Sequence, residues 1–68
     1  MEKWKKVYES AILHRAEIVK SVLEDMETPA IVLNKKDSNY HFGHYEVHVS
    51  QDHVIKALKI IDEDIRFE

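Results

Sequence analysis

The sequence predicts an α+β domain in which two helices cover an antiparallel sheet. Three observations support this fold class. Apolar residues recur at helical spacing in two separate segments, and a segment between these two alternates between apolar and polar residues. The 68 residues are enough for only one domain, and they contain no repeat, low-complexity tract or linker. We therefore expect one domain over residues 1–68.

The first strand and the first helix are expected at the start of the chain. Residues 3–9 form a β-prone mixture around Trp4 and Tyr8. Ser10 is suited to cap a helix over about residues 11–26, where apolar residues recur at helical spacing. The predicted buried stripe of this helix comprises Ile12, Ala16, Val19, Leu23 and Met26.

A hairpin is expected after the first helix. Pro29 cannot continue the helix. The following segment AIVLN has apolar residues at both odd and even positions, like a strand partly covered on both faces. The segment KKDSN has the composition of a turn, and Gly43 permits a bulge or a tight bend. The next segment, HYEVHVS, has the clearest two-residue alternation in the chain. One of its faces carries Tyr45, Val47 and Val49, and the other carries His44, Glu46 and His48.

A second helix and a possible last strand complete the predicted domain. Ser50 can cap this helix, and Asp52 suits its positive end. The tail IRFE can add an edge strand. The order β-α-β-β-α(-β) predicts a ferredoxin-like sandwich, an antiparallel sheet with both helices on one face. The predicted buried stripe of the second helix comprises Val54, Ala57, Leu58 and Ile61.

The composition excludes several classes of partner. Ten basic and thirteen acidic residues give a net charge of -3, and the basic residues are dispersed, so we expect no nucleic-acid binding. No apolar run approaches the roughly 20 residues of a membrane span, and the segment MEKWKKVYES lacks the apolar middle of a signal peptide, so we expect a cytoplasmic protein without membrane contact. A small domain without cysteine has no disulfide to stabilise it, so a homodimer is predicted.

Several short motifs resemble a known family. Over about residues 4–61 they are WKKVYES, AEIVKSVLE, PAIVLNKKDSNY, and FGHYEVHV leading to Ala57. The middle block is the most specific, since it contains a D-S-x-Y turn, an F-G step and an E-V-x-V strand. These motifs are similar to those of small bacterial domains called prokaryotic signal-transducing proteins, whose biochemical function is unassigned. Many members have Gly near the end of the first helix, where this chain has METP.

The resemblance implies a fold and a general role. The fold would be ferredoxin-like, similar to that of nitrogen-regulatory and amino-acid-sensing domains. The role would be regulatory or binding, and the resemblance supplies no catalytic residue.

The histidines do not predict a metal site. Four of the five lie between His41 and His53. His44 and His48 are four residues apart on the expected strand, so at about 3.3 Å per residue their backbones are roughly 13 Å apart. Glu46 between them could form only a pair of ligands on one side of an ion. A site with three ligands would need the chain to fold back or a second subunit to contribute. We therefore expect no metal and histidines that face solvent or an interface.

The face of the sheet away from the helices is the first candidate surface. If Val7 faces the helices, two aromatic residues of the first strand join this open face. It would then be a dimer interface or, alternatively, a ligand platform. A carboxylate among these residues would repel RNA phosphate. The predicted open-face residues are Trp4, Tyr8, His44, Glu46 and His48.

The hairpin turn is the second candidate site. It concentrates a carboxylate, a hydroxyl and two aromatics where a plain hairpin needs only Asn, Gly or Asp. Alternatively, the aromatics cover the end of the sheet while the polar side chains cap backbone amides. The candidate residues are Asp37, Ser38, Tyr40, Phe42 and Gly43.

No catalytic motif is present. The sequence has no cysteine nucleophile, no glycine-rich phosphate loop and no G-x-S-x-G motif, so we predict no catalytic residue, no cofactor and no enzymatic activity. The first hypothesis is a binding or regulatory module that acts through a protein or small-molecule ligand. The second is a structural homo-oligomer without a ligand. A metal-assisted enzyme that uses the histidine-rich hairpin is a distant third.

Overall fold

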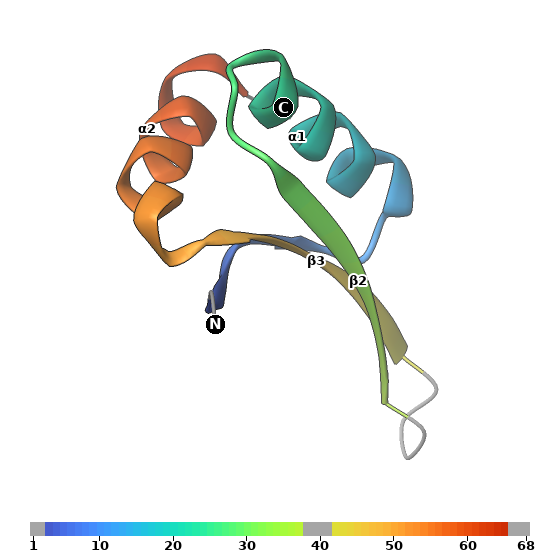
Figure 1. Ribbon diagram of the computed structural model, residues 1–68. Coiled ribbons are helices and arrows are strands. Elements are labelled where there is room, and N and C mark those ends of the chain that lie inside the picture. The colour runs from blue at the N-terminus through green and yellow to red at the C-terminus, as the bar shows by residue number, and fades with distance from the viewer. Residues whose placement is uncertain (1–2, 38–41, 66–68) are drawn as a thin grey trace.

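The computed structural model describes residues 3–37 and 42–65, which form a three-stranded antiparallel sheet and two α-helices (Figure 1). The predicted α+β class is confirmed. Within these two ranges, neither α-helix has the length and hydrophobicity of a membrane-spanning segment. The elements are, in order, β1 (Trp4–Ser10), α1 (Leu13–Asp25), β2 (Ala30–Asp37), β3 (Phe42–Ser50), a 3-10 turn (Gln51–His53) and α2 (Val54–Asp64).

The central strand of the sheet is β3, which pairs antiparallel with β1 on one side and with β2 on the other. β1 and β2 are therefore parallel to each other, with β3 between them and α1 as their connection. This arrangement is a split βαβ unit. Both β1 and β2 are end strands within the described part of the chain.

The core contains residues from both helices, and the alternating valines of β3 face it as predicted. Leu23 is its largest fully buried side chain. Burying such apolar side chains is the main favourable contribution to folding. The core cluster comprises Ala16, Val19 and Leu23 of α1, Ala30 of β2, Val47 and Val49 of β3, and Ala57 and Ile60 of α2.

The start of α1 differs from the prediction. Ser10 is the last residue of β1, and its Oγ accepts a hydrogen bond from the Ile12 N–H at 3.0 Å. It does not cap the helix, which begins at Leu13 without a side-chain cap. Ile12 and Met26 were both predicted to be buried, but they are 48% and 41% exposed. Both lie just outside the ends of the helix, so their side chains do not follow the helix face that packs on the sheet.

The end of α1 has a hydrogen-bond pattern that usually contains glycine. The Thr28 N–H donates to the Leu23 carbonyl at 2.9 Å, and the Glu27 N–H donates to the Glu24 carbonyl at 3.1 Å. Glu27 has a φ of 60°, the left-handed conformation that glycine adopts at least steric cost. This turn directs the chain through the fully buried Thr28 into β2.

Glu27→Gly is therefore expected to raise the free energy of unfolding by about 0.5–1 kcal/mol, because it removes the steric penalty of a left-handed glutamate. Thermal melts will show this as a higher melting temperature. Glu17→Gly in the exposed middle of α1 is the matched control, and it should destabilise the protein by about 1 kcal/mol. A lower melting temperature for Glu27→Gly than for the wild type would contradict the left-handed turn.

The buried stripe of α2 is shifted from the prediction. Leu58 is 48% exposed, whereas Ile60, which was not predicted, is buried. The 3-10 turn delays the start of α2 to Val54, and Ser50 makes no side-chain cap bond, so the predicted cap is also wrong. The predictions that hold are Ala57, which is buried, and Val54 and Ile61, which pack against the core.

The hairpin strands are longer than predicted. Residues 35–37 belong to β2 rather than to a turn, and Asp37 pairs with Phe42. Gly43 lies in regular pairing with Lys36 and has no positive φ, so the predicted bend or bulge at Gly43 is wrong. The connection at residues 38–41 lies outside the described residues. The predicted last strand over IRFE falls mostly on residues 66–68, which are also outside them, and Ile65 is in no strand.

Candidate functional site: the open face of the sheet

One face of the sheet packs on the core, and we call the opposite one the open face. Side chains alternate along a strand, so the buried valines of β3 place the residues between them on the open face. The strand register then assigns the neighbouring residues of β1 and β2 to the same face. The open face comprises Trp4, Lys6 and Glu9 of β1, Ile31, Leu33 and Lys35 of β2, and His44, Glu46 and His48 of β3.

A β-bulge in β1 determines which of its residues lie on this face. Lys6 pairs with His48, but the register shifts after it, so that Tyr8 pairs with the buried Val47. Tyr8 accordingly packs against the core, and the prediction that it lies on the open face is wrong. The same shift places Glu9 opposite Glu46 on the open face. The bulge therefore adds one carboxylate to the site and removes one aromatic ring from it.

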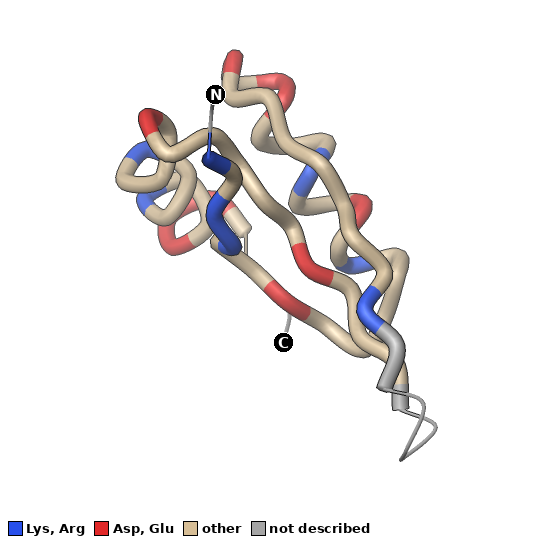
Figure 2. Tube along the Cα trace, turned by 60° about the horizontal axis from the view of Figure 1, so that its bottom comes forward, with Lys and Arg blue, Asp and Glu red and all other residues tan. Residues whose placement is uncertain are grey.

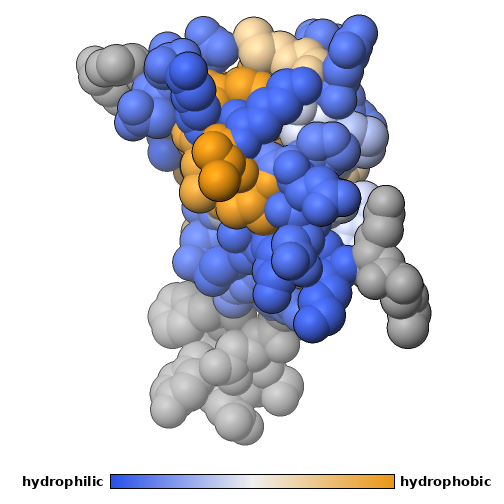
Figure 3. Space-filling model, turned by 60° about the vertical axis from the view of Figure 1, so that its left-hand side comes forward, coloured by the Kyte–Doolittle hydropathy of each residue, from blue (hydrophilic) through white to orange (hydrophobic). Residues whose placement is uncertain are grey.

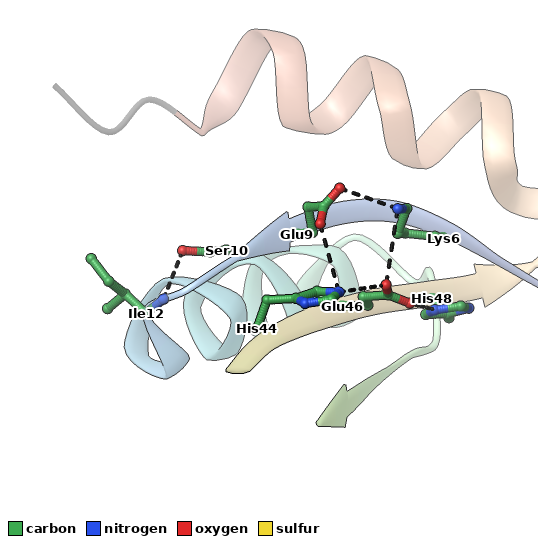
Figure 4. A network of polar contacts seen from close by, with 7 residues as sticks. All are labelled: Lys6, Glu9, Ser10, Ile12, His44, Glu46 and His48. Atoms are coloured by element: carbon green, nitrogen blue, oxygen red, sulfur yellow. Dashed lines mark hydrogen bonds and ion pairs between the residues drawn. The ribbon is translucent and has the colours of Figure 1, made fainter. Parts of the chain in front are cut away.

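Glu46 is at the centre of a polar network on the open face (Figure 4). Its Oε1 lies 2.9 Å from Nε2 of His48, and its Oε2 lies 2.9 Å from Nε2 of His44. An ionised carboxylate can only accept hydrogen bonds, so both rings donate from Nε2. One carboxylate thus bridges two histidines that are four residues apart.

Two side chains from β1 extend this network. Nζ of Lys6 lies 3.1 Å from Oε1 of Glu9 and 3.9 Å from Oε2 of Glu46. Oε2 of Glu9 lies 3.7 Å from Nε2 of His44. The network therefore joins two strands, and its ionised groups are two carboxylates and one ammonium when the histidines are neutral.

The network holds Glu46 in its ionised form. The pKa of Glu46 falls from the ordinary 4.5 to about 2, first because His48 and then His44 donate hydrogen bonds to the carboxylate. The positive charge of Lys6 lowers this pKa further, and partial burial opposes the shift. The Glu46 side chain is only 13% exposed, so its charge lies among its neighbours rather than free in solvent.

The stability of the protein should therefore depend on Glu46 in acid. A folded-state pKa below the unfolded one gives stability that is present above pH 4.5 and is lost as the pH falls toward 2. Glu46→Gln should be less stable than the wild type at neutral pH, and the difference should shrink over that range. Urea unfolding of both proteins at a series of pH values measures it. The facing groups Lys6, Glu9, His44 and His48 are the same in both proteins, so a pH-independent difference would contradict the shift.

The structure brings together part of each predicted site. His44, Glu46 and His48 form the network, and Trp4 lies at the end of β1 opposite Ser50, 40% exposed. Lys6 and Glu9 were not predicted: alternation with Trp4 is enough to place Lys6 on this face, whereas only the bulge places Glu9 there. In the second candidate site, Asp37 and Phe42 pair at the hairpin end of the sheet, and Gly43 follows in β3. Ser38 and Tyr40 lie outside the described residues, so a site at the turn stays a prediction.

The network also contains a group of potential metal ligands. Single ligand atoms of Glu9, His44 and Glu46 all lie within 4.8 Å of one another. The argument that three ligands would need a fold-back or a second subunit is wrong, because β1 supplies the third ligand within one chain. The Lys6 ammonium would compete with a metal cation for these ligands, because its Nζ contacts Glu9.

Comparison with known proteins finds no similar family model, curated protein or solved structure.

Proposed function

We propose that this protein is a regulatory or binding module rather than an enzyme, and that its open face binds a partner protein. The observation that carries this proposal is the Glu46 network, in which a carboxylate is fixed by two imidazoles in the middle of a sheet face. A network with fixed geometry can select a partner group by charge and direction. We further propose that the protein is bacterial and cytoplasmic, and that its role is in signal transduction.

The shape of the open face favours a protein over a small molecule. Small-molecule sites are usually concave and largely apolar. Among the described residues, a hollow is lined by Glu24, Glu27, Thr28 and Pro29 at the end of α1, away from the open face. The open face instead combines polar groups with the partly exposed Trp4, Ile31 and Leu33, a mixture typical of protein interfaces.

The charges of the network indicate the chemistry of the partner. With neutral histidines, Glu9, Glu46 and Lys6 sum to one negative charge. Figure 2 shows basic and acidic residues distributed over both strands and helices, and the described residues form no uniformly basic side for nucleic acid. We therefore expect an arginine or lysine of the partner to meet Glu9 and Glu46, and an apolar group to meet Trp4.

A ferredoxin-like arrangement is part of this proposal. In that fold two helices cover one face of the sheet and leave the other free. The split βαβ unit supports it, as does a core that both helices share with β3. The resemblance to prokaryotic signal-transducing proteins supports the same fold and the regulatory role. A structural homo-oligomer without a ligand is the alternative function.

Capture of proteins from an extract of the native host tests the proposed function. Immobilised wild type, Glu46→Gln and Trp4→Ala are compared by quantitative mass spectrometry of the retained proteins. Glu46→Gln and Trp4→Ala should each retain at least tenfold less of a true partner than the wild type does. Glu17→Gln, an exposed control on α1, should retain as much of it as the wild type. A partner retained equally by all four proteins would contradict binding at the open face.

Divalent metal binding is a second candidate function, favoured by the convergence of Glu9, His44 and Glu46. Imidazole and carboxylate ligands suit zinc, and three protein ligands leave a position open. Calorimetric titration with zinc should show one site per chain in the wild type and in His14→Ala, an exposed control on α1. His44→Ala should abolish that site. Equal zinc binding by His44→Ala and the wild type would exclude this cluster.

A further inference from the structure

We propose that two copies of this chain associate through the outer edges of their β2 strands and form one continuous antiparallel sheet. In the described part of the chain, β3 is the sole strand partner of β2. Its outer edge therefore offers backbone N–H and C=O groups to another strand. This association goes beyond the proposed function, because it uses the backbone groups at the β2 edge of the sheet rather than the Glu46 network.

The two edges of the sheet differ in their protection. β1 carries the bulge and the exposed Lys5 and Lys6, and α2 contacts it. Bulges, lysines and covering helices are the features that prevent pairing at an edge strand. β2 pairs with β3 without a register shift, and its first four residues are AIVL. Since α1 contacts β2 as α2 contacts β1, the edges differ in the bulge and the lysines. The lysines of β2 begin only at Lys35, so its apolar half carries neither feature.

The side chains of this apolar half also lack cover in a single chain. Ile31 and Leu33 lie on the open face, only partly buried, and neither belongs to the core cluster or to the residues packed against it. Val32 between them faces the other way and packs against the core. A second β2 strand beside the first would cover Ile31 and Leu33 without disturbing the core.

The sequence of β2 favours the register that brings the most apolar side chains of the two strands together. Directly opposite residues must share a face, so the two-fold axis must pass through a residue. With the axis at Val32, Ile31 of each copy lies opposite Leu33 of the other, which joins four apolar side chains on the open face. An axis at Leu33 or Asn34 would place Lys35 opposite an apolar residue. An axis at Lys35 would place two like charges opposite each other.

Such a dimer suits the size and the surface of this chain. A single domain of 68 residues buries only about 60% of the surface that its unfolded chain exposes, and association adds apolar burial. The dimer would carry both Glu46 networks on one continuous face. Figure 3 shows apolar side chains on the α2 side as well, where Ile55 is 84% exposed. Ile55 and the 48% exposed Leu58 lie on a helix, and a helix does not offer the free backbone groups of a strand edge.

Sedimentation equilibrium with Leu33→Lys tests the dimer. The wild type should sediment at twice its mass of 8.1 kDa at high micromolar concentration. Leu33→Lys should weaken association at least tenfold while the far-UV spectrum stays native, because Leu33 is outside the core. Trp4→Lys is the matched control on the opposite edge strand and should dimerise like the wild type. A monomeric wild type, or equal dissociation constants for all three proteins, would overturn the proposal.

Spin labels at Lys35→Cys test the register. With the axis at Val32, the two labelled positions lie six residues apart along the paired strands, so their backbones should be roughly 20 Å apart. A dimer that Trp4→Lys weakens as strongly as Leu33→Lys would instead use the open face, and would also overturn the edge proposal. A label separation far from roughly 20 Å would overturn the register.

Discussion

Leu23→Ala is expected to lower the free energy of unfolding by about 2–4 kcal/mol. Leu23 is the largest fully buried side chain among the described residues, and it packs from α1 into the core cluster. Natural domains have roughly 0.05–0.15 kcal/mol of stability per residue, so a chain of this length has little to spare. We therefore expect a large population of unfolded Leu23→Ala at physiological temperature.

Leu13→Ala is the matched control for Leu23→Ala. It makes the same chemical change at the start of the same helix, where the leucine is 41% exposed. Its effect should be within about 0.5 kcal/mol of zero. Urea unfolding of both variants measures the difference. If Leu23→Ala were as stable as Leu13→Ala, a different face of α1 would have to pack on the sheet.

Val47→Asp is expected to prevent folding altogether, with a loss of more than about 4 kcal/mol. Val47 is fully buried on the central strand, and the core cluster around it is apolar. A carboxylate at this position would lose its hydration without gaining a hydrogen-bond donor or a positive charge as a partner. The loss should exceed that of any truncation in the core, because truncation leaves no unpaired charge.

Lys35→Asp is the control for Val47→Asp. It introduces the same carboxylate at an exposed position of the neighbouring strand, and it should leave the circular dichroism spectrum native. Val47→Asp should give the spectrum and the poor amide dispersion of an unfolded chain. A native spectrum for Val47→Asp would mean that the two faces of β3 are reversed, and that Glu46 points into the core.

The features predicted correctly from the sequence are those with a strong local periodicity. The alternation in HYEVHVS fixed which side chains of β3 are buried, because the wrong face would expose the valines and bury Glu46. The middle of α1 was predicted for the same reason, since Ala16, Val19 and Leu23 share one side of a helix. These features follow from the spacing of apolar residues within one element. That spacing does not depend on where the element begins or ends.

The features that were missed depend on contacts between distant segments. Nothing in WKKVYES marks the bulge, which exists only in the pairing of β1 with β3, and the bulge determines the places of Tyr8 and Glu9. The left-handed Glu27 is held by hydrogen bonds at the end of α1 although its residue type disfavours that conformation. Leu58 is exposed because α2 turns the side with Ala57 and Ile60 toward the core, and its local spacing fits either side.

The candidate site also combines residues predicted from local periodicity with residues placed by contacts between strands. The three residues of β3 were predicted together because they share one strand face, but their joint chemistry depends on Lys6 and Glu9 of β1. Those two residues reach the same face on opposite sides of the bulge, three positions apart rather than two. A site that is assembled across strands in this way has no signature at a fixed sequence spacing.

The central claim is that Glu46 is an ionised carboxylate, held by His48 and His44 on the open face. Carboxyl ¹³C NMR measures its titration directly, with Glu17 as an exposed reference in the same spectra. We predict a pKa of about 2 for Glu46 in the wild type, and a pKa that rises toward 4.5 in His48→Ala, where the largest cause of the shift is removed. A wild-type pKa near 4.5, unchanged in His48→Ala, would contradict the network.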